Sequence, residues 1–195
     1  MKTKYIFIAF ALTALLQAFV PLKMVYDNYN TETQGTVFKF KTEPVDPSDP
    51  FRGKYITLNF TSDSVYANTN PQFKSDENVY AVIDTDAQGY AKIKSVQRER
   101  PQDKTNYITT TVRYHNGDGR VFVNLPFDRY YMEESKAPDA EIMYNNYVRS
   151  ENSVPAYALV AIKNGRAVLT DVIIDSLPVK EYVIKHRNDA INMQP

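Results

Sequence analysis

Two short segments of the chain place arginine beside tyrosine. Arg52-Gly53-Lys54-Tyr55 and Asp128-Arg129-Tyr130-Tyr131 each lie directly before or at the start of a predicted strand. Arginine and tyrosine are enriched at binding hot spots because both combine a broad contact face with directional hydrogen-bond donors. The pattern therefore indicates a recognition surface. The alternative is that each arginine pairs locally, with Asp49 or Glu133, while the tyrosines pack in the core.

Carboxylates near these segments offer a second kind of chemistry. Asp46 and Asp49 lie in a stretch that two prolines hold extended, and Glu133 and Glu141 follow the second segment. Two such groups act as general acid and base when they converge at roughly 5 to 10 Å. The alternative function is thus a hydrolase or glycan-modifying enzyme that uses these carboxylates.

Other catalytic side chains are scarce. The chain has no cysteine, and its two histidines, His115 and His186, fall beside a turn and in the charged tail. The sequence offers no identifiable third ligand to complete a metal site and no glycine-rich loop that would bind phosphate. The sequence therefore predicts no specific reaction, no metal site and no cofactor.

The length of the chain limits the number of domains, and its net charge limits the kinds of partner. The chain has 195 residues, enough for one domain or two small lobes. Its 23 basic and 23 acidic residues give a formal net charge of zero, so no long-range field attracts a phosphate backbone. We expect no nucleic-acid partner.

The N-terminus predicts contact with a lipid bilayer. Lys2 and Lys4 precede an uncharged apolar run over residues 5–22, which as a helix is roughly 27 Å long and just spans a thin bilayer. The leading lysines favour a cytoplasmic N-terminus and an extracytoplasmic remainder. A cleaved secretory signal is the alternative, with the mature chain starting near Phe19, but Leu16-Gln17-Ala18 is a poor cleavage site.

The residues after this apolar run have the sequence pattern of β structure. Alternating patterns in Val37–Lys41, Tyr55–Phe60 and Tyr107–Tyr114 predict half-buried strands, and residues 79–96 and 157–172 each predict a hairpin. Asn164-Gly165 in the second hairpin is the strongest short turn signal, because both residues tolerate positive φ. The spacing of residues 138–149 predicts one short amphipathic helix that covers the sheet.

The two hairpins resemble each other at a constant offset. Placing Gly89 on Gly165 also places Ala91 on Ala167 and Tyr55 on Tyr131. Tyr80 matches Tyr157 after a one-residue gap. We therefore predict two pseudo-repeated β lobes, residues 36–101 and 112–178, after a membrane segment at residues 1–24 and before a tail at 179–195 whose structure is left open. Generic strand-turn-strand similarity is the alternative explanation.

The segment Asp49–Phe60 resembles the GDYXXLXY family of uncharacterised membrane-anchored bacterial proteins. Its frame Arg-Gly-x-Tyr-x-x-Leu-x-aromatic is kept, but Lys54 stands where the family has aspartate and Phe60 where it has tyrosine. Residues 127–133, 140–141 and 165–169 are also similar. The resemblance implies a single N-terminal membrane segment, an extracytoplasmic domain, no established activity and a polytopic membrane protein as partner.

These observations predict an all-β, two-lobed periplasmic domain tethered to the inner or plasma membrane by one N-terminal helix. The expected function is a non-catalytic binding or assembly module for an envelope or integral membrane protein. A small-ligand or lipid carrier would instead need an apolar cavity between the lobes. The expected binding residues lie in and around the two arginine–tyrosine segments: Asp49, Arg52, Gly53, Tyr55, Leu58, Arg129, Tyr131, Glu133 and Glu141.

Overall fold

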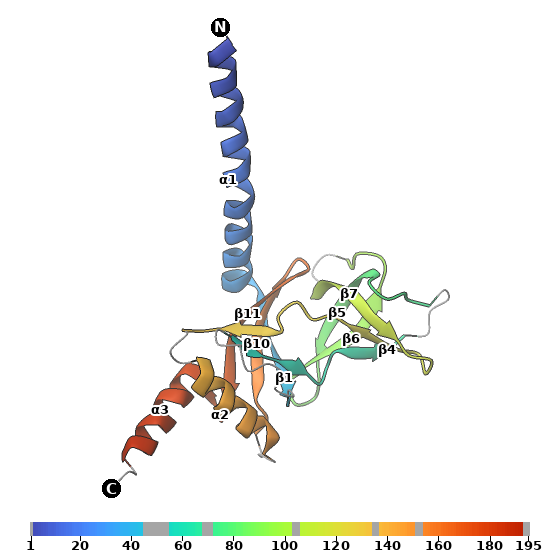
Figure 1. Cartoon of the computed structure of the whole chain (residues 1–195). Helices are drawn as coiled ribbons and strands as arrows, with labels where there is room; N and C mark the ends of the chain where they lie inside the picture. Colours follow the sequence, from blue (N-terminus) through green and yellow to red (C-terminus); the bar gives the residue numbers. More distant parts are fainter. Residues whose placement is uncertain are drawn as a thin grey trace.

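A long helix stands out from a β-rich domain in the computed structural model, which describes residues 2–44, 55–67, 72–102, 106–133, 137–150 and 154–192. This helix, α1 (Lys2–Gln34), points away from the domain, and the C-terminus lies at the opposite end of the molecule (Figure 1). The apolar side chains of residues 5–22 are exposed on every side of the helix. The helix is thus long and apolar enough to cross a membrane.

The first five-stranded sheet joins the two ends of the domain's sequence. Its order is β12–β11–β10–β1–β3, and every pairing is antiparallel. Along β1, Phe38, Phe40 and Thr42 are buried, which confirms the predicted alternation. The strand bounds are β1 (Thr36–Glu43), β3 (Asn59–Phe60), β10 (Tyr157–Lys163), β11 (Arg166–Ile174) and β12 (Leu177–Pro178).

The second five-stranded sheet has the order β4–β8–β7–β5–β6, and β2 and β9 form a separate two-stranded ribbon. A parallel bridge between Ile108 and Gly165 links the two large sheets. The bounds are β2 (Tyr55–Thr57), β4 (Ser64–Tyr66), β5 (Asn78–Thr85), β6 (Ala91–Gln97), β7 (Tyr107–His115), β8 (Arg120–Val123) and β9 (Arg129–Tyr131).

The two predicted hairpins, β5–β6 and β10–β11, have the same pattern of residue pairs. In β5–β6 the register shifts between Val82 and Ile83, after pairs that start at Tyr80. In β10–β11 it shifts between Leu159 and Val160, after pairs that start at Tyr157. Both hairpins therefore carry an irregularity after the third of these pairs.

Three phenylalanines from different elements meet in the core. Phe40 of β1 lies edge-on to Phe60 of β3 and to Phe127 before β9, with ring centroids 5.9 and 4.9 Å away. Phe60 and Phe127 are 5.2 Å apart. Edge-on aromatic contacts of this kind add to the free energy gained by burial. They fix the ribbon, which lies next to Phe60 and Phe127 in the sequence, against the first sheet.

Two helices pack on the β domain. α2 (Ala137–Arg149) confirms the helix predicted at residues 138–149, and its Ala140 and Tyr144 are fully buried. The expectation of a single covering helix was wrong, because the tail forms α3 (Val179–Asn192). Val179 and Val183, one turn apart, are buried in α3, but charged neighbours obscure this narrow apolar stripe in the sequence.

Gly35 is the single residue between α1 and β1. Its N–H donates a hydrogen bond of 2.8 Å to the carbonyl of Thr31. A Cβ at this position would collide with that carbonyl oxygen and would lie 3.0 Å from the backbone oxygen of Ile162. The close approach of α1 to β10 therefore requires glycine here.

We expect Gly35→Ala to lower the free energy of unfolding by about 1–3 kcal/mol, because backbone atoms must move to admit the methyl group. Gly117→Ala is the control, since nothing lies within 4 Å of a Cβ there; its effect should stay within about 0.5 kcal/mol. Denaturant unfolding of both variants measures the difference. Equal effects would show that the junction tolerates a side chain.

Candidate functional site

The β2–β9 ribbon brings Tyr55, the described residue of the first predicted arginine–tyrosine segment, against the second segment. Tyr55 lies directly opposite Tyr131 in the antiparallel register, and Thr57 lies opposite Arg129. The two tyrosine ring centroids are 5.4 Å apart. Alternate residues of a strand face the same side, so these four side chains share one face of the ribbon. We call them the ribbon face.

Arg129 crosses the ribbon face. Its guanidinium carbon lies 5.2 Å from the ring centroid of Tyr55, a cation–π distance, and its Nε is 4.0 Å from Asp128. A hydrogen bond with the Tyr131 side chain raises the pKa of Arg129, and the nearby Tyr55 and Asp128 raise it further. Tyr131 is 64% exposed. The ribbon face thus presents an ordered cation and an aromatic ring to the outside.

The opposite face of the ribbon is buried. Ile56 is fully buried, and Tyr130 is 5% exposed. The Tyr130 hydroxyl donates a hydrogen bond of 2.9 Å to Asp171 of β11. Burial first, and this carboxylate second, raise the pKa of Tyr130 well above its usual range. These contacts fix the ribbon to the first sheet and so orient the ribbon face.

The structure places the other expected binding residues that it describes in different environments. The side chain of Leu58 is 1% exposed and belongs to the core. Glu133 follows β9 and is exposed, whereas Glu141 is half-buried on α2. The predictions for Asp46, Asp49, Arg52 and Gly53 lie outside the described residues.

Part of the segment that resembles the GDYXXLXY family forms core structure. From Ile56 to Phe60, buried residues alternate with less buried ones, so Ile56, Leu58 and Phe60 point inward. The N–H of Leu58 donates to the carbonyl of Asp128 at 2.8 Å, which ties the segment to the residue before β9. A phenyl ring suits the packed position of Phe60, which provides the two aromatic contacts described above.

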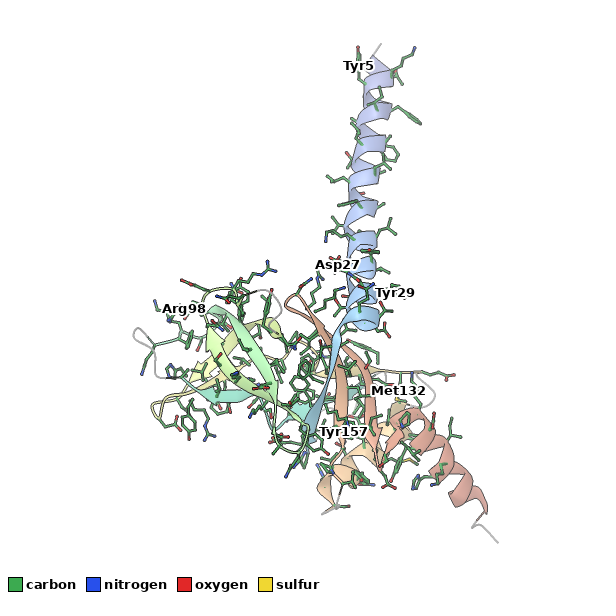
Figure 2. The ribbon with its side chains drawn as sticks, turned by 180° about the vertical axis from the view of Figure 1, so that it is seen from behind. Tyr5, Asp27, Tyr29, Arg98, Met132 and Tyr157 are labelled. Carbon is green, nitrogen blue, oxygen red and sulfur yellow. The ribbon has the colours of Figure 1, made fainter. Side chains whose placement is uncertain are left out.

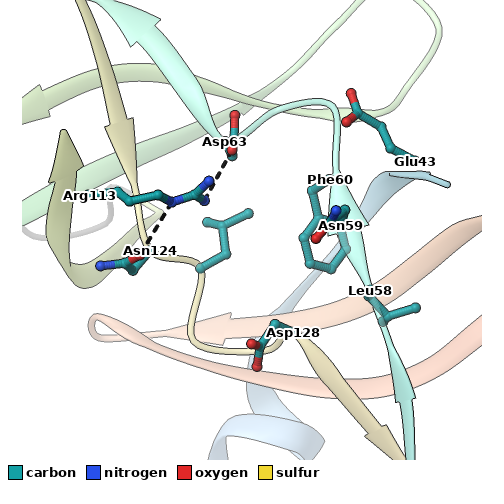
Figure 3. A pocket seen from close by; sticks show the side chains of 9 residues that line it. Glu43, Leu58, Asn59, Phe60, Asp63, Arg113, Asn124 and Asp128 are labelled. Atoms are coloured by element: carbon teal, nitrogen blue, oxygen red, sulfur yellow. Dashed lines mark hydrogen bonds and ion pairs between the residues drawn. The ribbon is translucent and has the colours of Figure 1, made fainter. Parts of the chain in front are cut away.

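A polar cleft of about 580 Å³ lies beside this segment. Arg113 of β7 is its central cation, with an ion pair of 3.1 Å to Asp63 and a hydrogen bond of 3.4 Å to the Asn124 side chain (Figure 3). The lining residues are Glu43, Leu58, Asn59, Phe60, Asp63, Arg113, Asn124, Leu125 and Asp128.

Sequence reasoning missed this cleft because its charged residues come from four separated segments. No motif joins Glu43, Asp63, Arg113 and Asp128. Within the described part of the chain, no group of three histidine or acidic residues is arranged to hold a metal ion. The cleft can offer hydrogen bonds and carboxylate oxygens to a polar ligand, and Arg113 is already occupied by Asp63.

The fold and the ribbon define a class of protein in which a mostly β domain is carried on an N-terminal apolar helix. The sequence model described as "GDYXXLXY protein" matches residues 17–172. The chain therefore belongs to the GDYXXLXY family. No curated protein and no solved structure matches it.

Tyr130→Phe should change how stability depends on pH. Because folding raises the pKa of Tyr130, the folded state keeps this proton after the unfolded chain has lost it. Its stabilisation is complete below the ordinary tyrosine pKa of about 10 and is lost as the pH rises through the higher folded value. The variant should therefore lose less stability than the wild type above pH about 10.

The same substitution should cost about 1 kcal/mol at neutral pH, because it leaves Asp171 without this donor. Tyr131→Phe is the control, since its side chain is exposed. Thermal unfolding followed by circular dichroism at neutral and alkaline pH measures both effects. Parallel pH profiles for wild type and Tyr130→Phe would contradict the assignment.

Proposed function

We propose that this protein is a membrane-anchored binding module that contacts an envelope or integral membrane protein through the ribbon face. One observation carries the proposal: two sequence segments 76 residues apart place Tyr55, Arg129 and Tyr131 in one outward cluster. Ordered arginine and tyrosine side chains are effective anchors because little conformational entropy is lost on binding. The partner would supply carboxylates and apolar surface to this cluster.

The proposed location is a bacterial cell envelope, with α1 as an uncleaved single-pass anchor and the β domain on the extracytoplasmic side. The exposed apolar helix supports anchoring. Lys2 and Lys4 at its start support a cytoplasmic N-terminus. In this arrangement the ribbon face is presented to partners in or near the same membrane.

We also infer that the β domain contains two pseudo-equivalent lobes that have exchanged strands. The pair Tyr80–Gln97 corresponds to Tyr157–Ile173 once a one-residue gap is allowed in the first strand of the hairpin, and the register shifts then fall at corresponding points. β1, from the first lobe, pairs with β10 of the second, and β8, from the second lobe, pairs with β4 of the first. Each lobe thus completes the other's sheet.

The ribbon lies where the two inferred lobes meet. Tyr55 and Tyr131 are corresponding residues of the repeat, and they lie directly opposite each other. An antiparallel pair of corresponding residues is what a pseudo-twofold axis through the ribbon would produce. The candidate site would then be a product of the association of the lobes.

Site-specific photocrosslinking tests the binding function. With benzoylphenylalanine in place of Tyr131, we expect a discrete crosslinked envelope protein in intact cells, because the ring is exposed on the ribbon face. The control position is Tyr66, which is 63% exposed and also lies beside an arginine, Arg120. Arg129→Ala should reduce the Tyr131 adduct roughly ten-fold or more, the loss typical of a hot-spot residue.

The proposal fails if Tyr66 captures the same protein with equal yield, or if Arg129→Ala leaves the Tyr131 adduct unchanged. A thermal-unfolding midpoint within a few degrees of wild type would show that Arg129→Ala acts locally. Mass spectrometry of the adduct identifies the captured protein.

Strand exchange between the lobes predicts how a split chain behaves. Fragments 1–104 and 105–195 should fold together as a one-to-one complex and not alone, because both five-stranded sheets take strands from both fragments. Size-exclusion chromatography and circular dichroism in detergent measure assembly. A cooperative unfolding transition in either fragment alone would exclude this exchange.

A further inference from the structure

α1 continues past its apolar run directly into the β domain. The run ends at Leu22, but the helix reaches Gln34, and Gly35 alone separates it from β1. The extension from Lys23 to Gln34 adds about 18 Å of helix. Thr31 within it is 2% exposed, so one side of the extension packs on the domain. The helix therefore sets the height of the domain above the membrane.

The tip of the β10–β11 hairpin docks on this extension. Arg166 lies 2.9 Å from the carboxylate of Asp27, which also accepts a hydrogen bond of 2.7 Å from Lys23. Lys163 donates to the side-chain oxygens of Asn30 and Gln34 at 3.0 and 2.7 Å. The hairpin thus points toward the membrane end of the domain, and Figure 2 shows Asp27 and Tyr29 at this junction.

The position of Asp27 gives the height of the hairpin tip. Asp27 is five residues past Leu22, or about 7.5 Å of helix. The headgroup layer on each side of a bilayer is about 5–8 Å thick. The pair between Asp27 and Arg166 therefore lies at the outer part of this layer. Tyr26, which is 66% exposed, lies at the depth of the interfacial aromatic belt.

The charges around the tip favour an anionic surface. Lys23 and Arg166 share the single carboxylate of Asp27, which leaves one net positive charge. Their side chains are 57% and 49% exposed. Lys163 is held by neutral amide oxygens, so its charge is not cancelled by these partners.

A second basic segment lies beside the tip. Tyr107 contacts the position where Gly165 would carry a Cβ, and Arg100 lies 5.9 Å from the ring centroid of Tyr107. Arg98 lies on the side of the domain from which α1 leaves (Figure 2). Glu32 on α1 and Glu99 between the two arginines are exposed carboxylates, and Arg98 is paired with Glu77. The basic residues named on this face (Lys23, Arg98, Arg100, Lys163 and Arg166) thus outnumber the acidic ones (Asp27, Glu32, Glu77 and Glu99) by one.

We propose that this face is seated on the membrane and binds anionic phospholipid headgroups through Lys23 and Arg166. The inference rests on the membrane anchoring proposed above. Phosphate oxygens would complete the hydrogen bonds that these exposed cations leave open. The hairpin tip acts as a second point of contact, so the domain keeps one orientation relative to the bilayer.

Single spin labels test this seating, since the chain has no cysteine of its own. Ala14→Cys reports on insertion of α1, and Asn164→Cys reports on the hairpin tip. Gln88→Cys is the matched control in the corresponding turn of β5–β6. That turn is next to Tyr90, whose ring lies 5.9 Å from Tyr157 at the start of β10, far from α1 (Figure 2).

The protein is reconstituted in vesicles of phosphatidylcholine and phosphatidylglycerol that contain a nickel-chelating lipid. Nickel at the headgroups should strongly relax the label at position 164 and leave the label at 88 near its nickel-free value. Glu99→Cys provides a second label on the same face, because Asn164 has φ of 52° and cysteine is less suited to that conformation. Equal relaxation at 164, 99 and 88 would overturn the seating.

The label at Ala14 separates the two hypotheses. Access of oxygen but not of a water-soluble relaxant to this label shows that α1 is inserted in the bilayer. If nickel then fails to relax the labels at positions 164 and 99, the seating alone is refuted. Access of the water-soluble relaxant to Ala14 would instead refute the anchor, and with it the inference.

Charge variants test the headgroup chemistry. Removing Lys23 and Arg166 together, as Lys23→Gln and Arg166→Gln, should lower the enrichment of phosphatidylglycerol around the protein about five-fold for each charge removed. Lys92→Gln with Lys94→Gln removes the same charge from β6 and should leave the enrichment unchanged. Native mass spectrometry of the lipids that the protein retains measures the enrichment of phosphatidylglycerol. Equal enrichment in both double variants, or a bound protein segment in place of lipid, would refute the proposal.

Discussion

The pairing of β1 with β10 is the interaction on which the rest of the structure depends. β1 continues from α1 through one residue, and β10 carries the hairpin that docks back onto α1. The pairing runs from Thr36–Ile162 to Lys41–Tyr157, so it closes a loop of more than a hundred residues. Closing such a loop costs conformational entropy, which burial of Phe38 and Phe40 must offset. α1 and the sheet are therefore joined both along the chain and by this docking contact.

The two faces of the ribbon divide a structural role and the proposed recognition role between adjacent residues. Tyr130 points inward to Asp171, while Arg129 and Tyr131 on either side of it point outward. Strand geometry enforces this division, because successive side chains face opposite sides. The buried tyrosine thus fixes the backbone that carries the proposed recognition residues. A binding face prepared in this way loses little entropy when a partner docks.

Local features of this fold could be predicted from the sequence, whereas contacts between distant segments could not. The turn at Asn164-Gly165 adopts the positive φ that its residue types favour, and α2 follows its apolar spacing. The meeting of Tyr55 with Tyr131 needed the register of two short strands, which no local pattern specifies. The cleft at Arg113 was missed for the same reason. Leu58 was expected among the binding residues, but the alternation of its segment places it in the core.

The short path from α1 to the ribbon bears on how a small ribbon could serve as the proposed contact. Gly35 leaves no flexible linker, and Tyr130 ties β9 to the sheet that begins at β1. A partner held in the same membrane would therefore meet the ribbon face at one height and in one orientation. Confinement of this kind raises the effective concentration of the two surfaces, so a cluster of three side chains can suffice where a soluble complex would need a larger interface. The proposed contact therefore depends on the anchor as much as on the ribbon.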